Sequence, residues 1–200
     1  MIQLLTLFSS SESVIILVTF VLSAVLIALL RYKDGQRITP DGEMYLQAGR
    51  GEQVPAPYYL RWLVPYLLRT SKRAWDLTTL ISLLLSTMLI LCIATWSTSL
   101  TLWGSIALAV LWIMLPINRL NVKYVPLVDA PATTIAITAA LSMMLGHPYL
   151  AICLSLLSGT CKENAPILAY LVATLPLGFI QSTPLLLGMI APAVRSILST

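Results

Sequence analysis

The sequence predicts an all-α fold: a polytopic transmembrane bundle of about seven helices, with an interfacial helix in its first long loop. Hydrophobic residues make up 58% of the 200 residues and charged residues only 10%, whereas soluble domains carry roughly 25% charged residues. The mean hydropathy is +0.88. Because so few polar residues cannot cover a surface in water, we expect residues 1–200 to form a single transmembrane domain of an integral, multi-pass protein. We expect it to lie in a bacterial-type inner or plasma membrane.

Seven apolar runs follow one another along the chain, and a spanning helix needs about 20 such residues. The expected helices cover about residues 12–30, 77–95, 100–117, 130–145, 149–161, 167–180 and 184–198. Lys162–Pro166 separates the fifth run from the sixth. As one continuous helix, these two runs would be longer than a bilayer is thick. We therefore interpret them as a helical hairpin.

The one long polar loop, residues 31–76, contains an aromatic and apolar segment, Tyr58–Leu68. Its eleven residues are too few to span a bilayer. Trp and Tyr favour the headgroup region. We therefore expect this segment to lie along the membrane surface as one or two helical turns broken near Pro65.

Alternation through seven helices would place all twelve Lys and Arg on one side of the bilayer, with seven of the eight acidic residues. Eight of the basic residues lie in loop 31–76, and the others are Arg119, Lys123, Lys162 and Arg195. Only Glu12 and His147 would fall opposite. Either the positive-inside rule or a site for an anionic, lipid-linked substrate explains this segregation. The sequence leaves both explanations, and the side of the membrane, open.

Two carboxylates, Asp41 and Glu43, flank Gly42 directly after Pro40. Carboxylates at this spacing in a loop can share a cation, or one can act as a base that the other orients. A solvated turn is the simpler interpretation. If the protein uses a cofactor, this pattern points to a divalent cation held by Asp41 and Glu43.

Lys162 and Glu163 interrupt an apolar stretch, and ionisable residues in such places are costly enough to suggest a function. A self-paired structural turn is the alternative. Asp129 precedes Ala130-Pro131 and could simply cap the following helix. Further candidates for anion binding are basic residues in the loops on the same side: Arg50, Arg61, Arg119 and Lys123. Arg61 could instead serve as a snorkelling anchor.

Four short elements resemble those of the GT-C superfamily of polytopic membrane glycosyltransferases, which use lipid-phosphate sugar donors. The stretch 41–51 is similar to the family's first-loop segment with its acidic residue and Tyr, and 59–65 is similar to an Arg-x-x-x-Pro element. Residues 128–131 and 159–163 resemble later elements at helix ends. The resemblance extends over about residues 14–180.

The resemblance implies inverting transfer of a sugar from a polyprenyl-phosphate donor to an acceptor hydroxyl. Asp41 would be the general base, and Glu43 would orient Asp41 or help to hold a cation. The implied partners are membrane lipid and the lipid-phosphate-linked sugar donor, and not nucleic acid. Residues implied in substrate or phosphate binding are Arg50, Arg61, Arg119, Lys123, Asp129, Lys162 and Glu163.

A second class of function fits the same sequence: a non-catalytic multi-pass membrane protein, either a small lipid or solute transporter or an assembly subunit. Lys162-Glu163 separates the two classes. A transporter would hold this pair at mid-membrane facing a cavity, whereas a transferase would hold it at the charged face near Asp41.

Overall fold

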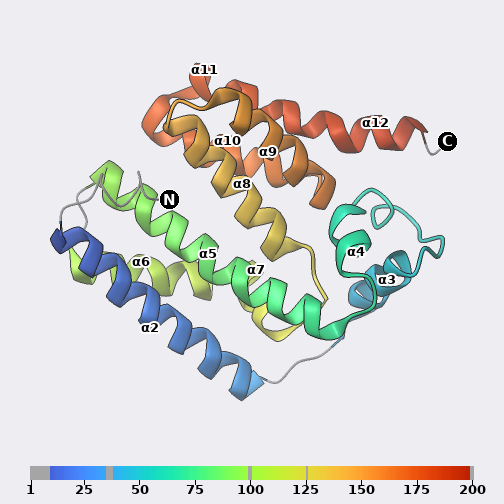
Figure 1. Ribbon diagram of the computed structural model, residues 1–200, viewed down its shortest axis with the longest axis horizontal. Coiled ribbons are helices and arrows are strands. Elements are labelled where there is room, and N and C mark those ends of the chain that lie inside the picture. Colours follow the sequence, from blue (N-terminus) through green and yellow to red (C-terminus); the bar gives the residue numbers. More distant parts are fainter. Residues whose placement is uncertain (1–9, 35–37, 99–100, 125, 199–200) are drawn as a thin grey trace.

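The computed structural model describes residues 10–34, 38–98, 101–124 and 126–198, and within these ranges it is helical and contains no strand (Figure 1). The longest helices are α2 (Ser10–Asp34), α5 (Lys72–Thr98), α6 (Leu102–Met114), α8 (Asp129–Met144), α9 (Pro148–Cys161) and α10 (Ala165–Leu177). Helices α2, α5 and α6 pack together, and so do α8, α9 and α10. Contacts between α5 and α8 join the two groups. The predicted all-α class is therefore confirmed.

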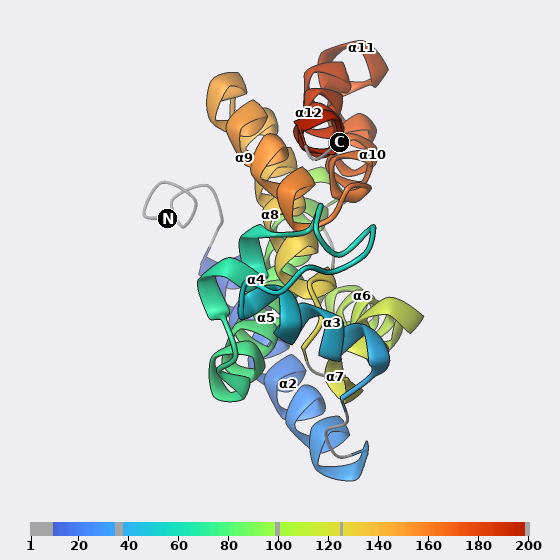
Figure 2. The same ribbon diagram turned by 90° about the vertical axis from the view of Figure 1, so that its right-hand side faces the viewer.

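Shorter elements cover the ends and one side of this bundle: α3 (Pro40–Gly49), α4 (Leu63–Leu68), α7 (Pro116–Lys123), α11 (Phe179–Ser182), the 3₁₀ helix η1 (Thr183–Met189) and α12 (Ile190–Leu198). Helices α3 and α4 pack against each other. Both views place them at the end of the bundle where α5 begins (Figures 1 and 2). We call this the charged end.

Small residues fill the interior of the second group of helices. Ala136, Ala139 and Ala140 of α8 are fully buried and face a core that includes Ala151 and Ala173. Residues without bulky side chains allow helix backbones to approach closely, as at helix interfaces in membranes. The alanines of this group thus allow its helices to pack closely, while larger side chains such as Ile137 and Leu185 are buried beside them.

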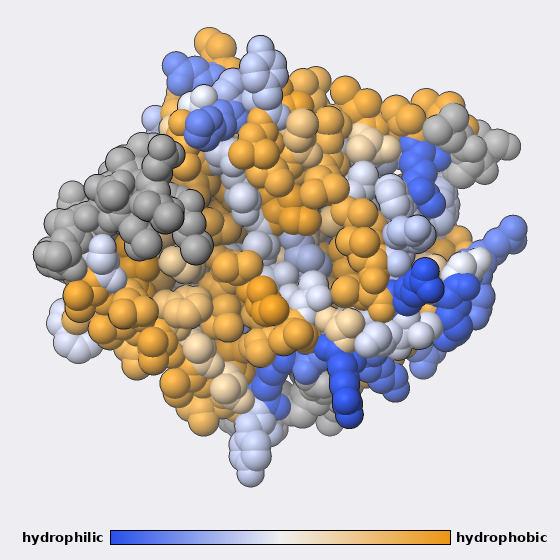
Figure 3. Space-filling model, in the orientation of Figure 1, coloured by the Kyte–Doolittle hydropathy of each residue, from blue (hydrophilic) through white to orange (hydrophobic). Residues whose placement is uncertain are grey.

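The outer face of α2 shows the opposite composition. Val14, Leu17, Val21 and Leu29 are each 53–61% exposed. In the space-filling view, hydrophobic residues spread over the bundle, while the most hydrophilic ones gather near α3 and α4 (Figure 3). Large aliphatic side chains that point outward along a whole helix face form an extended apolar surface, which is unusual for a soluble protein.

Two stretches of the described chain are long and apolar enough to cross a membrane, Ser13–Tyr32 and Lys72–Ala94. The other apolar helices are shorter; α6, for example, has 13 residues and would reach about 20 Å at 1.5 Å per residue. A hydrocarbon core is about 30 Å thick. The seven-span bundle therefore stays a prediction, while two helices have the length to span.

The polar loop predicted at 31–76 is largely helical, which corrects that expectation. Thr39 caps α3 by accepting a hydrogen bond from the Gly42 N–H at 3.1 Å, Pro40 occupies the first turn, and Asp41 and Glu43 follow within it. A capping Thr, an early Pro and early acids all favour a helix start. Asp41 therefore belongs to a helix and not to a loop turn.

Other boundaries also differ from the prediction. Helix α5 begins at Lys72 instead of about Leu77, and α7 occupies part of the loop expected at 118–129. Pro65 does not break the interfacial segment, because it lies in the first turn of α4, where a missing N–H costs nothing. The helix expected at 184–198 is divided between η1 and α12.

Candidate functional site

A network of polar side chains joins α3 to the segment before α4. The Tyr58 hydroxyl donates a 2.5 Å hydrogen bond to Asp41 Oδ1. The Tyr58 ring meets Tyr45 edge to face, with centroids 5.3 Å apart. Because Tyr45 is 2% exposed, this contact anchors the exposed Asp41–Tyr58 pair to the interior.

Arg61 links this group to the turn between α9 and α10. Its Nε and Nη2 donate to the two carboxylate oxygens of Glu163 at 2.8 and 2.5 Å, and its Nη1 donates to the Tyr45 hydroxyl at 2.8 Å. Such a bidentate pair fixes geometry as well as charge. It ties together segments 102 residues apart in the sequence.

The neighbouring Lys162 donates a hydrogen bond to Asp129 Oδ1 and forms an ion pair with it. Lys162 caps the C-terminus of α9, and Asp129 is the first residue of α8 and only 8% exposed. The pair therefore joins the charged ends of α8 and α9. We call Asp41, Tyr45, Tyr58, Arg61, Asp129, Lys162 and Glu163 the charged network.

The network fixes several protonation states. Burial raises the pKa of Tyr45, against the opposing effect of its Arg61 hydrogen bond, and the hydrogen bond to Asp41 raises the pKa of Tyr58. Both hydroxyls therefore act as neutral donors or acceptors at pH 7. The Arg61 hydrogen bonds lower the pKa of Glu163. With two cations and three carboxylates, the network carries a net charge of −1.

Five sequence-predicted candidates thus meet in one network: Asp41, Arg61, Asp129, Lys162 and Glu163. Asp129 does not act as an N-terminal cap, because α8 starts at Asp129 itself and the cap position is Val128. Lys162-Glu163 lies at the charged end, close to the Asp41 group, and not midway along a helix.

A divalent cation held by Asp41 and Glu43, if the protein uses one, stays a prediction. Residues two apart on a helix point in different directions, so the helical conformation of α3 separates the two carboxylates. Glu43 is exposed. Within the described ranges, no group of three or more His, Cys, Asp or Glu is arranged to hold a metal ion.

Three predicted basic residues lie elsewhere. Arg50 pairs with the exposed Glu52, two residues away, in the segment after α3. Arg119 and Lys123 lie on α7, which packs against α2, α5 and α6, and the Lys123 ammonium is 5.2 Å from the centre of the Tyr124 ring. The contacts that the structure shows for Arg50 and Lys123 do not join them to the charged network, and Arg119 lies on α7.

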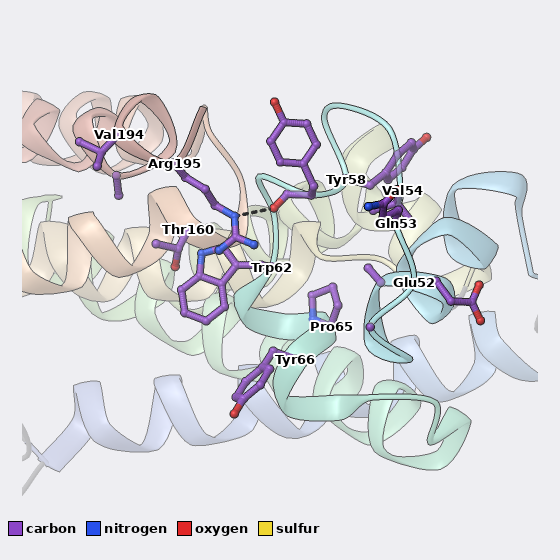
Figure 4. A pocket seen from close by; sticks show the side chains of 14 residues that line it. Glu52, Gln53, Val54, Tyr58, Trp62, Pro65, Tyr66, Thr160, Val194 and Arg195 are labelled. Atoms are coloured by element: carbon purple, nitrogen blue, oxygen red, sulfur yellow. Dashed lines mark hydrogen bonds between the residues drawn. The ribbon is translucent and has the colours of Figure 1, made fainter. Parts of the chain in front are cut away.

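A pocket of about 910 Å³ adjoins the network (Figure 4). One wall comes from residues 48–66 and the other from α12, with Thr160 of α9 between them. Its lining residues are Ala48, Gly51, Glu52, Gln53, Val54, Tyr58, Tyr59, Trp62, Pro65, Tyr66, Thr160, Ala191, Val194 and Arg195. Tyr58 belongs to both the pocket and the charged network, so the two features are contiguous.

Arg195 closes the pocket from the side of α12. Its Nε donates a 2.8 Å hydrogen bond to the Tyr59 carbonyl, and its guanidinium lies 5.1 Å from the centre of the Trp62 ring (Figure 4). Sequence reasoning put Arg195 on the charged side but gave it no role. The available signal was a lone basic residue in the last turn of an otherwise apolar helix.

A second cavity of about 580 Å³ shares Ala48, Gly51 and Tyr66 with the first and adds Arg69. Arg69 has φ 48°, a left-handed conformation that is costly for a residue with a Cβ. The Trp75 indole N–H donates to the Arg69 carbonyl at 2.9 Å. A Cβ on Gly49 would come within 2.7 Å of that oxygen, so α3 and α4 fit together only with glycine there.

No protein family model, curated protein or solved structure matches this chain. Its function is therefore inferred from three features of the molecule: the charged network, the pocket beside it, and the distribution of apolar side chains between interior and exterior. The first two features meet at Tyr58, and the third concerns the bundle as a whole.

Proposed function

We propose that this chain is a multi-pass membrane glycosyltransferase of GT-C type, which transfers a sugar from a polyprenyl-phosphate donor to an acceptor hydroxyl. One observation carries the proposal. Asp41, Arg61 and Glu163, far apart in sequence, belong to one network beside a pocket with apolar walls. A transferase acting on a lipid-linked donor needs polar chemistry and an apolar surface at one place.

The membrane location is supported by which side chains face outward. The exposed face of α2 is aliphatic, whereas Ala136 and Ala140 lie in the core. Large aromatic side chains are strongly exposed at helix ends: Trp103 at the start of α6, Tyr149 at the start of α9 and Tyr32 near the end of α2. Amphipathic rings favour the membrane–water interface.

In the proposed reaction, the Asp41 carboxylate removes the proton from the acceptor hydroxyl. The electron pair left on the acceptor oxygen then forms a bond to the anomeric carbon of the donor sugar. The bond from that carbon to the phosphate oxygen breaks, and its electrons leave with the lipid phosphate. Protonated Asp41 then returns its proton to water, so that the enzyme is restored.

The rest of the network positions this base. Tyr58 donates to Asp41 and thereby restricts the orientation of the carboxylate. Tyr45 supports Tyr58 and is held in turn by Arg61. Because preorganised groups need little rearrangement during reaction, a rigid connection from Glu163 to Asp41 favours catalysis at the surface of the charged end.

Sugar transfer by an Asp41→Asn variant tests the reaction. The change keeps the shape of the side chain and removes the base, so we expect a loss of roughly 10²–10⁴-fold in rate. Glu43→Gln is the matched control, because it neutralises a carboxylate in the same helical turn, and we expect it to keep near-normal activity. Full transfer by Asp41→Asn, at equal amounts of folded protein in the membrane, would remove the proposed mechanism.

Labelling of single cysteines tests the multi-pass arrangement, in a background that lacks Cys92, Cys153 and Cys161. New cysteines at Gln53 and Asn164 should react from one side of the membrane, since both positions lie at the charged end. A cysteine at His147 should react only from the other side. Reaction of the Gln53 and Asn164 positions from opposite sides would disprove the arrangement.

A non-catalytic membrane protein, a small transporter or an assembly subunit, is the second candidate, and one observation favours it. Both cations of the network, Arg61 and Lys162, are already paired with carboxylates of the same chain. Such pairing can serve structure alone. If Asp41→Asn and Arg61→Gln each affect only the amount of folded protein, and never a rate, the non-catalytic function is favoured.

A further inference from the structure

We infer that the 910 Å³ pocket between residues 48–66 and α12 binds an amphiphile that carries a phosphate-type anion on an apolar chain, with Arg195 as the ligand of its head. The inference rests on the proposed function only for the identity of this amphiphile as the sugar donor or its lipid product. Binding itself requires no transfer reaction.

The first argument is electrostatic. The charged network has a net charge of −1, and its cations Arg61 and Lys162 are engaged by Glu163 and Asp129. An added phosphate there would meet uncompensated negative charge. The network is therefore a poor site for an anion, although both cations look suitable in the sequence.

Arg195 differs from these two cations. Among the described residues it contacts the Tyr59 carbonyl and the Trp62 ring, and not a carboxylate. Its Nε makes the hydrogen bond, so the two terminal nitrogens are available for an oxyanion, for which a guanidinium is well shaped. Glu52, the one acidic lining residue, is already paired with Arg50.

The second argument concerns the pocket walls. Val54, Trp62, Pro65, Ala191 and Val194 present mainly hydrocarbon or aromatic surface. A volume of 910 Å³ lies within the roughly 300–1,000 Å³ typical of small-molecule sites. Apolar walls with one cation at their edge favour a ligand with an apolar chain and one anionic group.

The third argument concerns the mouth of the pocket. Tyr66 and Val194 line it and are also 63% and 47% exposed. On the same two helices, Leu67 of α4 and Ile197 of α12 are 66% and 73% exposed. Both helices that contribute to the pocket therefore also carry strongly exposed apolar side chains. An alkyl or isoprenoid chain bound in the pocket would have apolar partners on either helix.

The pocket also brings the head of its ligand close to the proposed base. Tyr58 lines the pocket and donates to Asp41, and Thr160 lines it two residues before Lys162. A phosphate held by Arg195 would therefore lie beside the network without being inside it. This separation keeps the anion away from three carboxylates while leaving the reacting sugar near Asp41.

Binding of three probes to the purified full-length chain tests the inference: farnesyl phosphate, farnesol and inorganic phosphate. Native mass spectrometry or ligand-induced thermal stabilisation provides the readout. We expect farnesyl phosphate to bind roughly 10- to 100-fold more tightly than farnesol, which is the ratio given by a charge-assisted hydrogen bond. Inorganic phosphate, which lacks the chain, should neither stabilise the protein nor displace farnesyl phosphate.

Two variants locate the site. Arg195→Gln should reduce farnesyl phosphate binding by roughly 10- to 100-fold and leave farnesol binding unchanged. Arg73→Gln, which removes one charge from the exposed start of α5, should change neither. Ala191→Trp fills the pocket without altering Arg195 and should weaken both farnesyl phosphate and farnesol, so the site can be assessed even if Arg195→Gln does not fold.

Three results would overturn the inference: normal farnesyl phosphate binding in folded Arg195→Gln, normal binding of both lipids in Ala191→Trp, or equal competition by inorganic phosphate. Asp41→Asn separates this inference from the proposed function. It should slow transfer by roughly 10²–10⁴-fold and retain Arg195-dependent binding. Arg195-dependent binding in a chain that shows no transfer with any donor would support the pocket and reject the transferase.

Discussion

At the charged end of the molecule, Arg61–Glu163 and Lys162–Asp129 connect segments that are 102 and 33 residues apart. The opposite end, where α8 is joined to α9, contains the exposed residues His147 and Tyr149. Its interior is formed by apolar residues, both small, such as Ala140, and larger, such as Ile137 and Leu141. Polar pairs hold one end together, and close apolar packing holds the other.

This difference indicates what each end does. Partly buried ion pairs pay a desolvation cost and are weak evidence for stability on their own. Only 10% of the residues are charged, yet five of them meet in one network, and we propose that this network serves more than packing. The opposite end carries little charge and suits an apolar boundary.

The largest effect on stability is expected from breaking the Arg61–Glu163 pair. Arg61→Gln leaves a partly buried carboxylate without its bidentate partner and removes the hydrogen bond to Tyr45, so we expect a loss of about 2–3 kcal/mol. Unfolding in detergent measures it. The matched control is Arg50→Gln, which breaks the exposed Arg50–Glu52 pair and should have no measurable effect. Equal destabilisation by both variants would contradict the distinction between the network and surface pairs.

At the opposite end the sensitive property should be volume, not charge. Ala140 is 0% exposed, so Ala140→Leu must displace neighbouring helices and should cost about 1–3 kcal/mol. Val21→Leu on the outer face of α2, where Val21 is 53% exposed, should change stability by less than about 0.5 kcal/mol. The same unfolding assay compares the two. A tolerated Ala140→Leu would mean that this core is loosely packed.

The sequence predicts the helical class and most helix positions well, because long apolar runs leave few alternatives. It mispredicts α3, since Pro40-Asp41-Gly42 also matches a turn. The helix signals were present in Thr39, Pro40 and the early acids.

The candidate site was only partly predictable, for a physical reason. The sequence marks Lys162 and Glu163 as unusual and makes Arg61 a candidate, but it does not reveal which cation meets which carboxylate. That pairing depends on how the segment before α4, the start of α8 and the turn between α9 and α10 lie relative to one another. For the same reason Arg195 was overlooked: its role depends on Trp62, a residue 133 positions earlier in the chain.

Acid should weaken the charged end selectively. The Arg61 hydrogen bonds lower the pKa of Glu163 in the folded protein below its usual value of 4.5. The Arg61–Glu163 pair therefore contributes fully to the free energy of unfolding above about pH 4.5, and this contribution is lost as the pH falls through the pKa of the folded state. Since Glu163 is 38% exposed, solvent screening limits the loss to about 1 kcal/mol. Unfolding measured from pH 7 to pH 3.5 should show it. The Glu163→Gln variant should be less stable than the wild type at pH 7 and should lose less stability on acidification. If its stability depends on pH as strongly as that of the wild type, Glu163 is not the group responsible.

The smallest effect is expected at His147, the only histidine in the chain. It occupies the N-cap position of α9 but makes no side-chain capping hydrogen bond, and it is exposed. The Ala151 N–H bonds to the His147 backbone carbonyl at 3.0 Å, a contact that any residue can provide. His147→Ala should therefore change stability by less than about 0.5 kcal/mol, and it should leave both farnesyl phosphate binding and sugar transfer at their normal levels. Unfolding and binding measured on the same preparation check this. A loss of binding in this variant would place part of the functional site at the end opposite Asp41, and the division between a chemical end and an apolar end would then be wrong.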